Sequence, residues 1–280
     1  MSATSLAPGV IRNSAADAAL RAALRLWFLA AVTGQWAFAI YVSAFYGGAA
    51  SRGEWLTWNK VLTHGYEAGN TIGNATVAAH LLFAAIITIS GPLQLVSAVR
   101  ERFPAFHRWN GRSYLLAASV MGVSGLYLAL SGRKVAGNGS VSITINAILI
   151  LVFAVAAAHF AIARDFKTHR RWAIRLFLVV SGVWFFRVGL MFWLIVNGGP
   201  AGFNAHAFKG PFLTFMGFAQ YLVPLTVFES YLLTQRSAGA RGRIAMTAGL
   251  LALTAMMAVG IFGAISGMWL PVLRGGDSSV

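Results

Sequence analysis

Cysteine is absent from the chain, and acidic residues are scarce. The 280 residues include no cysteine and seven aspartates and glutamates, against 22 lysines and arginines. Without cysteine the chain has no disulfide, no thiolate metal ligand and no cysteine nucleophile. The sequence also lacks a phosphate-binding glycine-rich loop, a His-Glu-x-x-His motif, a Gly-x-Ser-x-Gly motif and a pair of carboxylates within an apolar run. It therefore does not indicate an ATPase or a hydrolase.

Apolar residues dominate instead. Hydrophobic residues make up 58% of the chain and charged residues 10%, whereas ordinary globular domains carry about 25% charged residues. Runs of about 20 apolar residues are typical of membrane-spanning helices. We therefore expect an all-α integral membrane protein with about seven transmembrane helices in one bundle. The predicted spans are residues 22–46, 73–99, 113–133, 141–163, 172–197, 211–233 and 244–271.

These spans define one transmembrane domain over residues 22–272, between a polar N-terminal tail (1–21) and a short C-terminal tail (273–280). Gly91-Pro92 in the second span predicts a kink without a break. In the last span, Gly260, Gly263 and Gly267 predict close helix packing, which we expect to lie inside the bundle.

Lysine and arginine are distributed unevenly along the chain. If the N-terminus is cytoplasmic, fifteen of them lie in inner segments, six in outer segments, and Arg187 lies inside a span. The positive-inside rule favours this orientation, and an odd number of spans places the C-terminus outside. The net charge of +15 then needs no nucleic-acid partner. The expected partner of the inner face is a bilayer with anionic head groups.

Two basic segments at predicted inner ends share one pattern. FPAFHRWNGRSY (103–114) and FKTHRRWAIRLF (166–177) each contain a His-Arg pair, a tryptophan and a later arginine before a span. Three interpretations compete: anchoring to lipid phosphates, joint ligation of a haem or metal by His107 and His169, or binding of a cytoplasmic anionic ligand. The arginines predicted to contact lipid or anion are Arg108, Arg112, Arg170, Arg171 and Arg175.

A few ionisable residues lie within the predicted spans, where such groups are candidates for function. They are His80, His159, Arg187 and Glu229. We expect Glu229 to pair with an arginine near the inner end, with Arg164, Arg175 and Arg236 available. His159 lies near the same inner face as His107 and His169 and could join them as a ligand.

His80 and Arg187 lie deeper. Counted at 1.5 Å per residue from the outer ends of their spans, their depths differ by only about 5 Å. Polar residues of other spans share this outer half, and an unpaired buried arginine would be costly. These polar residues form either a structural hydrogen-bond network or a pocket for a small anionic or amphipathic ligand. Its candidate residues are His80, Tyr127, Asn146, Arg187, Gln220 and Tyr221.

A haem shared by His80 and His159 is excluded by their depths. The two histidines lie on spans that run in the same direction, yet they differ in depth by about 16 Å, and an iron–nitrogen bond is about 2 Å long. A haem between His107 and His169 remains open, as does one at His80 with a second ligand that we do not identify. The candidate residues for a haem or quinone are therefore His80, His107, His159, His169 and Arg187.

Three groups of residues together resemble a bacterial family of predicted membrane proteins, the domain of unknown function DUF2306. They are His80 with the GPLQ of 91–94, the HRWNGR of 107–112 with the SGLYLAL of 124–130, and the HRRW of 169–172 with Arg175. The resemblance covers about residues 75–230 and implies a multi-pass protein of the bacterial plasma membrane. It implies no activity.

Function therefore rests on the candidate sites. One hypothesis is a membrane redox or cofactor-binding protein that uses haem or quinone. The second is a transporter or binding protein for a small anionic or amphipathic ligand. The third is a scaffold or assembly factor without a small-molecule site.

Overall fold

Helices make up almost all of the computed structural model, which describes residues 8–131, 140–237 and 239–276. Within these residues there is no β-strand. The long helices are α1 (Pro8–Val42), α3 (Thr71–Leu95), α5 (Pro104–Leu130), α6 (Ser140–Ile162), α7 (Phe166–Val180), α8 (Gly182–Asn197), α9 (Pro211–Ser237) and α10 (Ala240–Gly263). The short elements are a π turn (Ser43–Gly47), α2 (Gly48–Ser51), a 3-10 helix (Trp55–Lys60), α4 (Ser97–Arg102), a second π turn (Ala264–Trp269) and α11 (Leu270–Leu273).

The expected multi-pass architecture is confirmed. Six helices of the described chain are long and apolar enough to cross a membrane, and α7 with α8 makes a seventh span if the pair is counted as one. This pair is bent by 52°, whereas the sequence had predicted one uninterrupted span over 172–197. The cytoplasmic N-terminus remains a prediction.

Three helices begin earlier than predicted. Helix α1 begins at Pro8, inside the predicted N-terminal tail, and α5 begins at Pro104. Proline suits the first turn because its missing N–H would have no partner there. Helix α7 begins at Phe166, where the Asp165 carboxylate accepts a hydrogen bond from the Thr168 N–H at 3.1 Å. Hydrogen bonds from the side chain and backbone of Thr168 also lower the pKa of Asp165. Both His-Arg motifs therefore lie in the first turns of helices.

Two of the predicted spans contain a break. Helix α3 continues through Pro92, as expected, and ends at Leu95, because Val96 adopts an extended conformation (φ −78°, ψ 114°) before α4. The second break is at Ser181, between α7 and α8. Adjacent serine and glycine are a known cause of sharp helix bends, and Ser181 is followed by Gly182.

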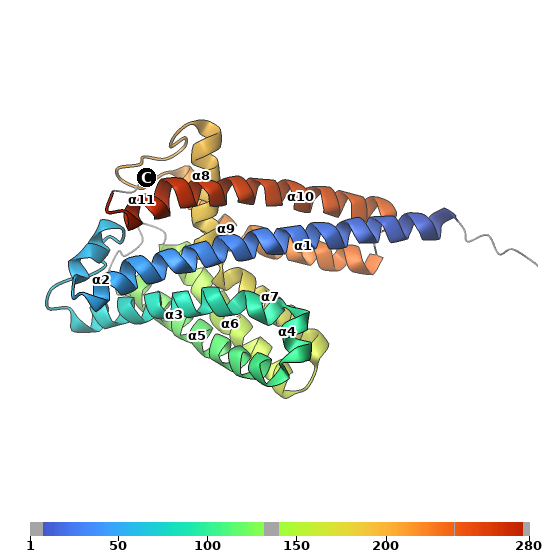
Figure 1. The fold of residues 1–280 in the computed structure, drawn as a ribbon, viewed down its shortest axis with the longest axis horizontal. Helices are drawn as coiled ribbons and strands as arrows, with labels where there is room; N and C mark the ends of the chain where they lie inside the picture. Colours follow the sequence, from blue (N-terminus) through green and yellow to red (C-terminus); the bar gives the residue numbers. More distant parts are fainter. Residues whose placement is uncertain (1–7, 132–139, 238, 277–280) are drawn as a thin grey trace, which may run out of the picture.

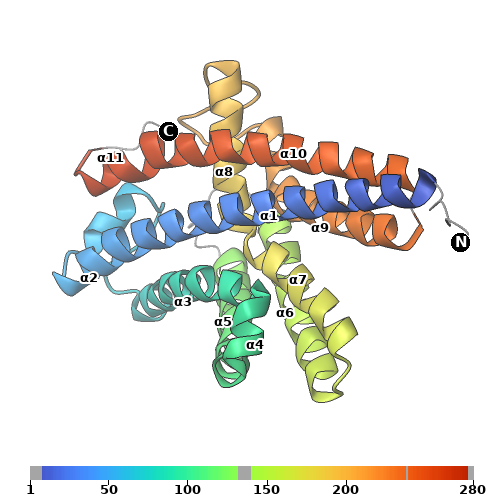
Figure 2. The same ribbon diagram turned by 45° about the vertical axis from the view of Figure 1, so that its right-hand side comes forward.

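The helices pack in two connected groups. Helices α1 and α10 lie side by side, and α8 crosses both in the two views (Figures 1 and 2). Helix α5 packs between α3 and α6, and α6 packs against α7. Helix α1 contacts α3, and α9 contacts both α7 and α8, so these helices join the two groups.

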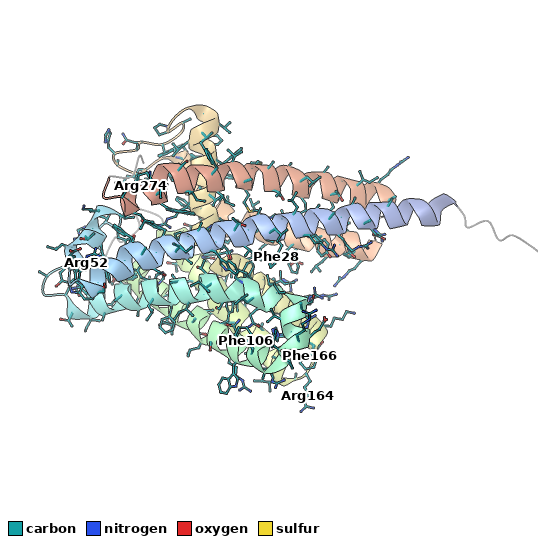
Figure 3. The ribbon with its side chains drawn as sticks, viewed as in Figure 1. Phe28, Arg52, Phe106, Arg164, Phe166 and Arg274 are labelled. Atoms are coloured by element: carbon teal, nitrogen blue, oxygen red, sulfur yellow. The ribbon has the colours of Figure 1, made fainter. Side chains whose placement is uncertain are left out.

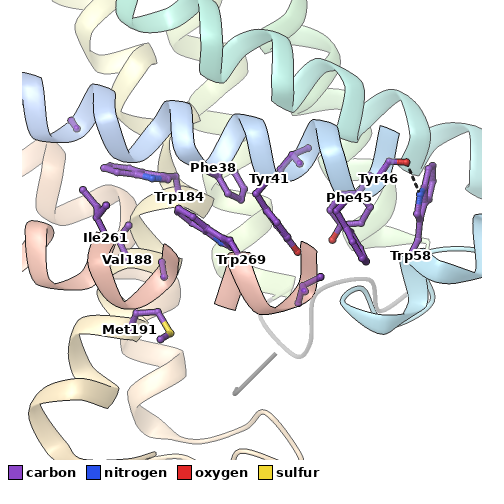
Figure 4. Packing of buried hydrophobic residues seen from close by; sticks show 14 of the residues in the cluster. Phe38, Tyr41, Phe45, Tyr46, Trp58, Trp184, Val188, Met191, Ile261 and Trp269 are labelled. Atoms are coloured by element: carbon purple, nitrogen blue, oxygen red, sulfur yellow. Dashed lines mark hydrogen bonds between the residues drawn. The ribbon is translucent and has the colours of Figure 1, made fainter. Parts of the chain in front are cut away.

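An aromatic core fills the first group (Figure 4). The Phe38 ring lies 5.3 Å from the Trp269 ring, centroid to centroid, and the Trp58 indole N–H donates to the Tyr46 carbonyl at 3.1 Å. Trp184 of α8 is 2% exposed in the same cluster. Close helix approach is built on glycine, since a Cβ at Gly260 of α10 would collide with the backbone carbonyl oxygen of Val188 on α8. The predicted internal packing is confirmed at Gly263, where a Cβ would lie 2.6 Å from Cδ1 of Ile195 on α8, and Gly260 adds a second close approach.

Different segments of the chain lie at the two ends of the molecule. Arg164 and Phe166, at the connection between α6 and α7, lie at the same end as Phe106, whereas Arg52 and Arg274 lie at the opposite end (Figure 3). We call the end with α4 and the α6–α7 connection the basic end.

Candidate functional site

A large groove opens between the two helix groups and reaches the basic end. Its volume is about 2060 Å³, and nine helices contribute to its lining: α1 and α3 through α10. Most of its walls are apolar, with Leu115 of α5, Phe177 of α7 and Val188 of α8 among them. Binding sites for small molecules are typically concave and mostly apolar with a few polar groups, so this groove is the candidate site.

Cations gather where the groove meets the basic end. They come from four helices and the α6–α7 connection, and among the described residues that line the groove none is acidic. We call this set the basic mouth: Arg25, Arg100, Arg108, Arg112, Arg164, Lys167, Arg170 and Arg171. It contains four of the five arginines predicted to contact lipid or anion. The mouth provides guanidinium groups that can bind phosphate or carboxylate oxygens in pairs.

His107 and His169 both line the groove beside this mouth. Each is the fourth residue of its helix, on α5 and α7 respectively, and His169 lies within electrostatic range of His107. Nδ1 of His169 lies 2.8 Å from the carbonyl oxygen of Ala157. Nδ1 of His107 is buried and has no hydrogen-bond partner in the described chain. The structure thus brings together the two histidines that the sequence placed at equal depth.

Arg175, the fifth predicted arginine, has a different environment. Its Nε and Nη2 both donate to Oε1 of Glu229, at 2.8 and 2.7 Å. Its guanidinium also lies over the rings of Trp172, at 4.8 Å, and Phe228, at 5.6 Å. The prediction that Glu229 pairs with an arginine is confirmed, and this pair ties α7 to α9.

The groove extends from the mouth to polar groups near the α7–α8 break. Gln220 of α9 lines it and is 7% exposed. A Cβ added to Gly182 would lie 3.5 Å from Oε1 of Gln220 and 3.1 Å from Nδ2 of Asn146. Oδ1 of Asn146 is buried without a partner in the described chain. Of the six residues predicted to form an outer-half pocket, Gln220 alone lines this groove.

The other residues of the predicted outer-half pocket lie in separate environments. Nδ1 of His80 lies 2.8 Å from the Ser124 hydroxyl, and the Arg187 guanidinium lies over the Phe38 ring at 5.4 Å. Tyr127 is 42% exposed, while Tyr221 is 1% exposed. In the described chain, the Arg187 guanidinium therefore faces the aromatic core at Phe38 of α1.

His159 does not join the other two histidines. Its side chain is exposed, and its ring contacts that of Phe160 at 5.1 Å between centroids. Of the five candidate cofactor residues, the groove is lined by His107 and His169 and not by His80, His159 or Arg187.

Several groove residues were not predicted from the sequence. Arg25, Arg100 and Arg164 reach the mouth from segments that carry no His-Arg pair, and Lys167 precedes the pair of the second motif. Outside the groove lining, Gln35 of α1 was also missed; its Nε2 donates to the Ser181 hydroxyl at 3.0 Å across the α7–α8 break. A glutamine in the middle of an apolar run was the signal that could have found it.

Comparison with known proteins gives one match. The family model described as a predicted membrane protein, DUF2306, matches residues 77–223, more than half of the chain. No curated protein and no solved structure matches the chain. The matched region contains both His-Arg motifs, the two histidines of the groove and Gln220.

Proposed function

Because the chain belongs to the DUF2306 family of predicted membrane proteins, a description that names no activity, we propose its function from the groove: the protein binds an amphipathic anion. The charged group of the ligand lies among the cations of the basic mouth, and its apolar part lies along the walls toward Gln220. The observation that supports this most directly is a single groove in which the cations of both His-Arg motifs meet a long apolar surface.

Charge and solvation favour this ligand class. The mouth holds eight cations and no described acidic residue, so an anion there gains charge-assisted hydrogen bonds, which contribute about 1.5–3 kcal/mol each. A small hydrophilic anion would leave the apolar walls without a partner. A neutral lipid would leave the arginines without one.

The test compares two ligands with the same tail. The full-length protein in nanodiscs of zwitterionic lipid is titrated with a long-chain alkyl phosphate and with the matching alcohol. We expect the phosphate to bind and to raise the unfolding temperature, and the alcohol to bind more weakly by about tenfold or more, since one charge-assisted hydrogen bond already corresponds to that factor.

Variants locate the site. Arg171, which is half-buried in the mouth, is changed to Gln, and we expect phosphate affinity to fall by about tenfold while alcohol affinity is retained. Arg241→Gln is the matched control, because Arg241 is exposed and does not line the groove. Arg187→Gln tests the outer-half pocket and should leave affinity unchanged. Equal affinity for phosphate and alcohol, or equal loss in Arg171→Gln and Arg241→Gln, would contradict the proposal.

A further inference from the structure

We propose that His107 and His169 are the two axial ligands of a haem iron in the groove. The inference rests on the proposed function, because haem is an amphipathic anion with two carboxylates and a large apolar face. The macrocycle would lie against the apolar walls, and its propionates would lie among the arginines of the mouth.

The position of the two histidines is the first support. They lie on different helices, at the same place in each helix, and line the same groove within electrostatic range of one another. Haem iron in proteins is commonly held by histidine, and ligands for cofactors in helical bundles come from facing helices. His107 of α5 and His169 of α7 would supply the two ligands from different helices that line one groove.

The hydrogen bond of His169 is the second support. A carbonyl oxygen can only accept, so the contact with Ala157 at 2.8 Å requires Nδ1 to carry the hydrogen. In the neutral ring, Nε2 then presents its lone pair. Metal-ligating histidines almost always donate their other N–H to a carboxylate, a backbone carbonyl or water. His169 therefore already has the tautomer and the fixed ring that a metal ligand needs.

His107 is the complementary half of the site. Nδ1 is buried and unpartnered within the described chain. An unpaired buried polar atom typically costs about 1–3 kcal/mol, and coordination of a metal would remove that cost. No hydrogen bond from Nδ1 of His107 fixes its ring within the described chain, whereas the ring of His169 is held by the Ala157 carbonyl.

The number of side chains that could coordinate a metal favours haem over a free metal ion. Within the described residues there is no group of three or more His, Cys, Asp or Glu that could hold a metal ion. Zinc in proteins takes three or four such ligands, and calcium takes six or more oxygens. A porphyrin supplies four nitrogen ligands itself, so two histidines complete the coordination of its iron.

The charged groups around the histidines suit the propionates. Arg108 and Arg112 follow His107, and Arg170 and Arg171 follow His169, and all four line the groove. Arginine pairs with carboxylates through two parallel hydrogen bonds. The same arrangement explains why each motif combines a histidine with two arginines that line the groove.

The experiment is an absorption spectrum of the full-length protein. Protein purified from haem-replete cells, and apoprotein titrated with haemin, should both show the Soret and visible bands of a six-coordinate, low-spin haem. His107→Ala and His169→Ala should lose the low-spin spectrum. His169→Met should remain six-coordinate with shifted bands, because methionine also ligates haem iron. His159→Ala is the matched control and should be unchanged, since His159 is exposed outside the groove.

The outcomes separate this inference from the proposed function. Absence of a six-coordinate spectrum from wild-type protein overturns the haem inference, and alkyl-phosphate binding then shows that the proposed function stands. A haemin spectrum that is the same in wild type, His107→Ala and His169→Ala also overturns it. Failure of both ligands overturns both proposals. If an alanine variant does not fold, the shift of bands in His107→Met and His169→Met decides, and unshifted bands overturn the inference.

Discussion

Replacement of Gly260 by alanine tests the close approach of α10 to α8. A Cβ at this position would collide with the backbone carbonyl oxygen of Val188, and would lie 2.8 Å from its Cγ1 and 2.9 Å from its carbonyl carbon. Two of these three atoms belong to the backbone of α8, so no side-chain rotation relieves the contact, and α8 and α10 must move apart. Overpacking of this kind costs about 1–3 kcal/mol.

The matched control lies on the same helix. A Cβ added to Gly249 has nothing within 4 Å, so Gly249→Ala changes the glycine content of α10 equally without the collision. Gly189→Ala is an intermediate case, since the nearest atom there is the terminal methyl of Met216, which can rotate away at little cost.

The assay is thermal unfolding of the purified protein in nanodiscs, followed by tryptophan fluorescence. Trp184 is 2% exposed and lies in the core where α1, α8 and α10 meet, so its contribution to the emission of the nine tryptophans changes when these helices separate. At about 2–4 °C per kcal/mol, Gly260→Ala should lower the midpoint by several degrees and Gly249→Ala should leave it in place. Equal midpoints for these two variants would refute the close approach of α8 and α10.

Two further predictions concern polar contacts between helices. A double-mutant cycle of Arg175→Ala and Glu229→Ala should give a coupling free energy of about 0.5–1 kcal/mol. The value is small because the Glu229 side chain is 47% exposed and exposed ion pairs contribute little to stability. A coupling of zero would contradict a stabilising ion pair between these residues. Ser181→Ala should cost about 1–3 kcal/mol, since it leaves the buried amide nitrogen of Gln35 without its partner. Gln35→Leu should cost less, because Oε1 of Gln35 is already unpartnered in the described chain and the Ser181 hydroxyl keeps its bond to the Phe177 carbonyl. The free energy of unfolding of both variants is measured in nanodiscs. A larger loss of stability in Gln35→Leu than in Ser181→Ala would contradict the expected order of the two costs.

The membrane spans could be predicted from the sequence because apolar length is a local property. Six predicted spans correspond to helices of sufficient length, and the seventh corresponds to the bent pair. The first residues of the helices could not be predicted from the sequence as reliably as the spans. Arg108 and Arg112 suggested a loop at the membrane surface, whereas Pro104 begins the helix and both arginines lie in its first turns.

The site was predicted only in part, because depth along a helix does not determine which way a side chain points. Arg187 and His80 were placed together by depth alone, yet Arg187 faces Phe38 of α1 and His80 faces Ser124 of α5. Tyr127 shares their half of the membrane but lies on the exposed surface of the described chain. The sequence predicted that Glu229 pairs with one of three nearby arginines, because opposite charges at similar depth were sufficient for that, and the structure identifies Arg175 as the partner.

The groove depends on the bend at Ser181. Hydropathy averaged along the sequence cannot reveal such a bend. A straight continuation of α7 would keep the helix beside α6. The 52° bend instead carries α8 across α10, where Gly260 allows a close approach. Phe177 before the bend and Val188 after it both line the groove, so the bend places one chain segment on two of its walls. The Gln35–Ser181 hydrogen bond holds α1 at this point. The break between α7 and α8 therefore shapes the groove. Both His-Arg motifs line it because α7 extends to the basic end, whereas α8 turns away and leaves the space between the helix groups open.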